Sequence, residues 1–105
     1  MDDSLDALES VIRQRLGGDP DQSYVARLHA RGPARIAQKL GEEAIETVIA
    51  AAAGDRAGLV GEAADLIFHL LVLLAEHDLS LADVRAELAR REGVSGLTEK
   101  ASRGG

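Results

Sequence analysis

The sequence "EAADLIFHLLVLLAE", residues 62–76, decides the fold. Asp65 and His69 are the only polar side chains between the glutamates at its two ends. A helix that is apolar on nearly every side is normally enclosed by other parts of the protein. The segment therefore predicts a core helix that is buried on most sides, with Asp65 and His69 held away from bulk water.

The remaining segments also have helical rather than strand patterns. Apolar residues recur at helical spacing in residues 4–16, 23–30, 34–53 and 81–92. Ser4, Asp55 and Ser80 are suited to cap the beginnings of helices, and Gly54 is suited to end one. The short connections between the segments favour antiparallel neighbours. We therefore predict an all-α protein, an antiparallel bundle of four to five helices.

Composition restricts the class of protein further. The 105 residues, 46% of them hydrophobic, suffice for one domain with one core. A formal net charge of −6 has the wrong sign for a general nucleic-acid binder, and the lack of cysteine excludes disulfides and thiolate metal sites. The longest uninterrupted apolar run is too short to cross a bilayer, and no signal peptide is evident. We expect a cytoplasmic domain over residues 1–105, with a helical bundle in 1–92 and a basic, Gly/Ser-containing tail in 93–105.

A second stretch, "QKLGEEAIETVIAA" at residues 38–51, carries Lys39 and three glutamates on one side of its predicted helix. Alone, this pattern is typical of a solvated face, with Lys39 paired to Glu43 four residues later. The next helix changes this interpretation, because Glu62 and Asp65 lie three residues apart on one stripe of it. Glu43 and Glu46 have the same spacing, so two antiparallel helices could direct four carboxylates into one gap.

Such a cluster of carboxylates predicts a cation site. Like charges that lie close together raise one another's pKa unless a cation compensates them. Oxygen ligands suit magnesium or manganese better than zinc. Di-iron bundles are a weaker alternative, because they use Glu-x-x-His on two helices and His69 has a different spacing. We interpret His69 as a core histidine that orients a metal-binding carboxylate.

These stretches resemble a known family. "KLGEEAIETVIAA" (39–51) and "LVGEAADLIFHLLVLL" (59–74) are similar to the EExxE and ExxD signature of the phosphoribosyl-ATP pyrophosphohydrolase family, within the all-α nucleotide pyrophosphatase superfamily. "SYVARL" (23–28) and "GLTEKASR" (96–103) extend the similarity over nearly the whole chain. The resemblance implies hydrolysis of the α,β-phosphoanhydride of phosphoribosyl-ATP, giving phosphoribosyl-AMP and pyrophosphate in histidine biosynthesis.

The resemblance also implies roles for individual residues. Four acids would bind Mg²⁺, or Mn²⁺ as a substitute: Glu43, Glu46, Glu62 and Asp65. Glu42 would assist them, and one carboxylate of the five would help to deprotonate the attacking water. Basic residues would contact substrate phosphates: Lys39, Lys100 and Arg103. For Lys39, an ion pair with Glu43 is an equal alternative.

Three functions remain open from the sequence. The first is the phosphoribosyl-ATP enzyme, and the second is a house-cleaning pyrophosphatase that acts on a noncanonical nucleoside triphosphate. The third is a helical dimerisation module without activity. Residues 66–75 are too apolar for one short chain to cover completely, so we expect a homodimer. The alternative is a monomer in which the first and last helices cover these residues. We also consider contact with the separate cyclohydrolase of the same pathway, and expect no nucleic-acid or membrane partner.

Overall fold

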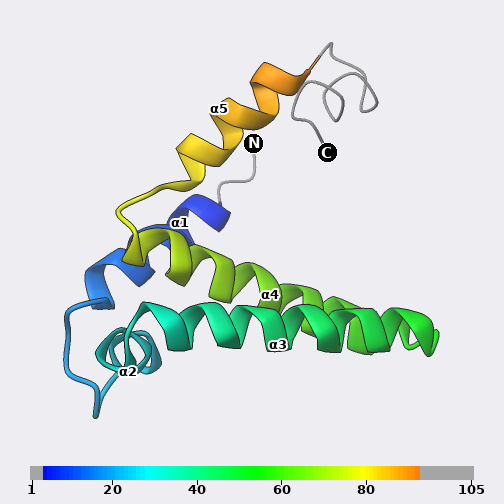
Figure 1. Cartoon of the computed structure of the whole chain (residues 1–105), viewed down its shortest axis with the longest axis horizontal. Helices are drawn as coiled ribbons and strands as arrows, with labels where there is room; N and C mark the ends of the chain where they lie inside the picture. The colour runs from blue at the N-terminus through cyan, green and yellow to red at the C-terminus, as the bar shows by residue number, and fades with distance from the viewer. Residues whose placement is uncertain (1–3, 93–105) are drawn as a thin grey trace.

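The computed structural model describes residues 4–92, and these residues form five α-helices and no β-strand. The helices are α1 (Ser4–Arg15), α2 (Tyr24–Arg31), α3 (Pro33–Ala52), α4 (Arg56–Glu76) and α5 (Leu81–Arg91). Figure 1 shows α3 and α4 lying side by side as a long antiparallel hairpin, with α1 and α2 gathered at the end where α3 begins. The prediction of an all-α protein is confirmed.

Short polar side chains fix where the helices begin. Ser23 caps α2, because its hydroxyl oxygen accepts a hydrogen bond from the backbone N–H of Ala26 at 3.2 Å. Ser80 and Asp83 form a reciprocal capping box at the start of α5. Gly54 has a φ of +70°, which suits the tight connection between α3 and α4. Ser4, predicted to cap the first helix, is the first of the described residues, so this cap stays a prediction.

The hydrophobic core lies at one end of the hairpin. Its buried apolar residues come from four helices: Ile12, Val25, Leu28, Ile36, Leu71, Val72 and Ala75. Farther along the hairpin the apolar side chains are open to solvent. These exposed residues are Ile45, Val48, Ile49, Val60, Ile67 and Leu70. Within this chain, α4 is therefore a core helix only over its C-terminal half, and the expectation that it is buried on most sides is wrong for the single chain.

The composition of α4 makes this exposure notable. By length and hydropathy alone, Arg56–Glu76 could cross a membrane, although the core helix of a soluble protein satisfies the same criteria. Only 17% of its most apolar window is buried. The part of the chain that the structure describes thus leaves a largely apolar helix incompletely covered.

The last helix is attached differently. None of the residues from Leu81 to Arg91 is buried, and in Figure 1 α5 projects away from the hairpin. Polar contacts with α1 hold it: Arg85 pairs with Asp6 at 2.7 Å, and Glu9 accepts a hydrogen bond from the backbone N–H of Leu81 at 2.6 Å. Of the apolar residues of α5, Leu81 at its beginning packs against the edge of the core. The rest of α5 lies outside the core.

Candidate metal centre

Three of the predicted acids meet between α3 and α4. One carboxylate oxygen each from Glu43, Glu62 and Asp65 lies within 4.8 Å of the other two. Glu43 comes from the middle of α3, whereas Glu62 and Asp65 occupy successive turns of α4 on one stripe. The antiparallel packing of two acid-containing helices therefore brings the two halves of the signature together, as the spacing predicted.

The burial of these acids shows that something is needed to balance them. Glu43 is 5% exposed, and Oε2 of Glu43 and Oε2 of Glu62 are buried without a hydrogen-bond partner among the described residues. A buried carboxylate oxygen without a partner is costly in free energy. Three clustered carboxylates, two of them with unsatisfied oxygens, form the kind of donor set that a hard cation binds. The residues present thus fit a divalent metal ion.

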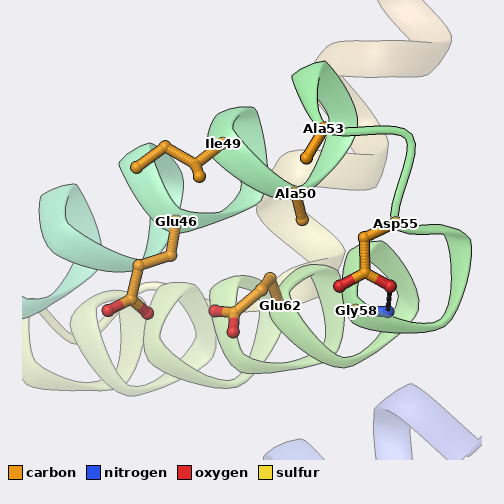
Figure 2. Close-up of a pocket in the computed structure, with 7 residues that line it drawn as sticks. All are labelled: Glu46, Ile49, Ala50, Ala53, Asp55, Gly58 and Glu62. Atoms are coloured by element: carbon orange, nitrogen blue, oxygen red, sulfur yellow. Dashed lines mark hydrogen bonds between the residues drawn. The ribbon is translucent and has the colours of Figure 1, made fainter.

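Glu46, predicted as the fourth ligand, lies beside this cluster and is exposed. Together with Glu62 it lines a cavity of about 360 Å³ near the turn between α3 and α4. Figure 2 shows the two carboxylates reaching from α3 and α4 into the same space. Glu46 is therefore next to the cluster and accessible to a ligand in the cavity.

The distribution of burial differs from the sequence-based expectation. Asp65 was expected to be buried because α4 is so apolar, but it is exposed, and Glu43 is the buried acid. Helical spacing puts Glu62 and Asp65 on one stripe of α4, but it does not determine how much of that stripe a neighbouring helix covers. Glu42 is not one of the three clustered acids, and its half-exposed carboxylate pairs with Arg35 at 3.4 Å.

Lys39 lies at one edge of the acidic cluster. Its Nζ is 3.4 Å from Glu43 and 3.7 Å from Glu42, so the predicted ion pair with Glu43 is present. Desolvation lowers the pKa of Lys39, but the hydrogen bond to Glu43 and the charges of Glu43, Tyr24 and Glu42 raise it more, and the net pKa is raised. Lys39 is thus firmly cationic beside the candidate metal site, where a phosphate contact stays a prediction.

His69 has a hydrogen-bond partner at each of its ring nitrogens. It is 5% exposed, and its Nδ1 lies 2.7 Å from the backbone carbonyl oxygen of Asp65. A carbonyl only accepts hydrogen bonds, so Nδ1 carries a proton. In the neutral imidazole, Nε2 then accepts a hydrogen bond from the Tyr24 hydroxyl, 2.8 Å away. His69 therefore holds the backbone of Asp65 and joins α4 to α2. That it orients the carboxylate of Asp65 stays a prediction.

Tyr24 is the site residue that the sequence did not reveal. Its ring stacks on Phe68 with centroids 6.1 Å apart and meets His69 edge-on at 5.7 Å. No spacing rule connects a residue at the start of α2 with one in the middle of α4, since their contact depends on tertiary packing. Lys100 and Arg103, predicted to bind phosphate, lie outside the described residues.

Comparison with known proteins adds independent information. The family model described as phosphoribosyl-ATP pyrophosphohydrolase matches residues 5–92. The chain is 66% identical over 103 residues to the phosphoribosyl-ATP pyrophosphatase of Rhizorhabdus wittichii, which covers 98% of this chain and 97% of that protein. It is 67% identical over 99 residues to the protein of the same name from Novosphingobium aromaticivorans, covering 94% of this chain and 92% of the relative. The relative of the same name in Parvibaculum lavamentivorans is 60% identical over 100 residues, covering 95% and 92%.

Proposed function

Since the chain belongs to the phosphoribosyl-ATP pyrophosphohydrolase family, we propose that it hydrolyses the α,β-phosphoanhydride of phosphoribosyl-ATP. The products are phosphoribosyl-AMP and pyrophosphate, and the reaction is an early step of histidine biosynthesis in the cytoplasm. The observation that carries the proposal is the extent of identity with relatives named for this activity, over nearly the full length of both chains. The acidic cluster between α3 and α4 supports it chemically.

We assign Mg²⁺ to the carboxylates of Glu43, Glu62 and Asp65, with Mn²⁺ as a substitute. A divalent ion bound there would allow an acidic site to accept a polyphosphate and would offset the charge that develops on the leaving pyrophosphate. The unsatisfied buried oxygens of Glu43 and Glu62 support this assignment, because they have no other partner in residues 4–92.

Other residues near the cluster have roles in proton transfer, phosphate binding and positioning. Glu46 lies beside the cluster, is accessible from the cavity and has no ion pair among the described residues. We assign it to accept the proton of the attacking water. Lys39 stays cationic at the opposite edge of the cluster and binds the phosphates that leave. Tyr24 and His69 hold the backbone of Asp65 in place through their shared hydrogen bond.

We propose further that a second copy of the chain covers the exposed apolar residues of the hairpin. Ile45, Val48 and Ile49 lie on one side of α3 and are 61–66% exposed, and Val60 of α4 is 71% exposed. Isolated chains seldom expose so many large apolar residues on two adjacent helices. Two-fold pairing of the hairpins is the simplest cover. Light scattering should therefore show a dimer, and a monomer that keeps full activity at nanomolar concentration would contradict it.

The test of the activity is a comparison of substrates. Turnover of phosphoribosyl-ATP should exceed that of ordinary and noncanonical nucleoside triphosphates and should require Mg²⁺. Preference for a noncanonical triphosphate would identify a house-cleaning pyrophosphatase instead. A lack of turnover with every substrate, in a dimer that stays folded, would favour the dimerisation module.

A further inference from the structure

The charged groups of the hairpin follow one another in a fixed order along its length. Lys39 lies at one end, beside Glu43, and the clustered carboxylates come next. Then comes the cavity at the α3–α4 turn, and Arg56 follows at the far end. From Asp65 to Arg56 the axis of α4 advances roughly 14 Å. Along the hairpin a positive group is thus followed by negative groups, a cavity and a second positive group. Such a series is suited to an extended ligand.

The cavity itself combines apolar and acidic walls. Ile49 and Ala50 of α3 and the adjoining Ala53 form the apolar side. Figure 2 shows Ala50 lying across the opening from Asp55 and Glu62. Its volume of about 360 Å³ lies in the range of small-molecule sites. These walls suit a heterocyclic base.

Asp55 is positioned so that one of its oxygens stays available. Oδ1 accepts a hydrogen bond from the backbone N–H of Gly58 at 2.9 Å, whereas Oδ2 has no partner among residues 4–92. A Cβ at residue 58 would overlap the Asp55 carboxylate, so glycine is needed there to keep this arrangement. Asp55 therefore presents a carboxylate oxygen at the edge of the cavity.

Arg56 comes directly after Asp55. It lines an adjoining cavity of about 230 Å³ together with Asp55, Gly54 and Leu59. Its guanidinium has no ion pair within the described part of the chain, in contrast to Arg35, Arg85 and Arg91. An arginine without a partner, beside a cavity, is suited to bind a phosphate.

The substrate of the proposed reaction has a matching series of charges. Its triphosphate is anionic, and its second phosphate, on the ribose attached at N1, is anionic as well. Substitution at N1 makes the adenine more basic than in ATP, because the protonated form is a delocalised amidinium. The base between the two anionic ends is therefore cationic at neutral pH.

We propose that phosphoribosyl-ATP lies along the hairpin with its leaving pyrophosphate toward Lys39 and its base in the cavity at the α3–α4 turn. Asp55 accepts a hydrogen bond from the cationic base through Oδ2, and Arg56 binds the phosphate of the N1-linked ribose. This inference rests on the proposed function. The reverse orientation would place the cationic base beside Lys39 and the second phosphate group away from Arg56, so the charges disfavour it. Asp55 and Arg56 are then the residues that distinguish this substrate from ATP.

Three ligands separate these contributions by calorimetry of the full chain in Mg²⁺: AMP, 1-methyl-AMP and phosphoribosyl-AMP. AMP has neither feature, 1-methyl-AMP has the cationic base alone, and phosphoribosyl-AMP has both. Asp55→Asn keeps an oxygen for the cap on Gly58 but removes the charge. The substitution should lower the affinity for 1-methyl-AMP and phosphoribosyl-AMP by roughly 10- to 100-fold and leave the affinity for AMP unchanged.

Arg56→Gln should lower the affinity for phosphoribosyl-AMP alone, by a similar factor. Arg15→Gln is the matched control, because Arg15 has no ion pair in the described residues and lies in α1, away from the cavity. Asp55→Ser, which also keeps a capping oxygen, repeats the test should Asp55→Asn lose helicity. Equal effects on all three ligands, or none, would overturn the proposal. Turnover of phosphoribosyl-ATP by the unaltered chain tests the proposed function separately.

Discussion

The acidic residues of the α3–α4 hairpin and of α5 differ in burial and in ion pairing. Glu43 in the hairpin is 5% exposed and has a buried oxygen without a partner, whereas the half-exposed Glu87 of α5 binds two arginines of its own helix. We expect the acids of the hairpin to lower the stability of the isolated chain and Glu87 to support its helix. The comparison indicates which carboxylates are available for a ligand: those for which the fold supplies too few cations.

The sharpest test of this comparison makes the same substitution in both regions. Glu62→Gln removes one charge and one donor oxygen from the cluster, so the kcat should fall by more than about a hundredfold at fixed Mg²⁺. Glu87→Gln alters an acid of the same type, but on a helix without buried residues, and should leave kcat unchanged. Steady-state turnover of phosphoribosyl-ATP measures both, with circular dichroism as the control for folding. Near-normal turnover in Glu62→Gln would remove the cluster from the mechanism.

The clustering of the acids in the hairpin was predictable from the sequence, because it follows from helical geometry. The spacing of Glu62 and Asp65 sets their relative direction on α4, and the antiparallel connection brings Glu43 to them. Periodicity does not determine which side of a helix its neighbours cover. For that reason the exposure of Asp65 was missed, and so was the hydrogen bond between Tyr24 and His69, which depends on how α2 packs against α4.

A second pair of substitutions compares apolar packing in the two regions. Leu71→Ala removes a side chain that is 2% exposed in the core and should lower the free energy of unfolding by about 2–5 kcal/mol. Leu88→Ala removes the same atoms from a position in α5 that is 60% exposed. It should change the free energy of unfolding by less than about 0.5 kcal/mol. Urea unfolding followed by circular dichroism gives both values. A large loss for Leu88→Ala would mean that α5 packs against something outside the described chain, such as the second copy.

Metal should stabilise the hairpin and not α5. At a Mg²⁺ concentration one hundred times its dissociation constant, binding to the folded state should add about 2.7 kcal/mol to the free energy of unfolding. Asp65→Asn should reduce this gain, and without metal it should be more stable than the unaltered chain, because fewer like charges then meet. Thermal unfolding in Mg²⁺ and in EDTA measures the effect. A Tm that does not respond to Mg²⁺ or Mn²⁺ would contradict the assignment of the cluster to a metal.

The smallest expected effect concerns the pH dependence of α5. Hydrogen bonds from Arg90 and Arg91 lower the pKa of Glu87 from 4.5 to about 2. A carboxyl group whose pKa is lower in the folded state stabilises that state above its unfolded pKa, and this contribution is lost as the pH falls through the folded pKa. The unaltered chain should therefore be slightly more stable than Glu87→Gln at neutral pH, and the difference should shrink between about pH 4.5 and 2. Salt should also reduce this difference in stability, because Arg90 is exposed and Arg91 is half-exposed. Urea unfolding of the two proteins at several pH values tests this, and a difference that grows on acidification would show that these ion pairs do not support the helix.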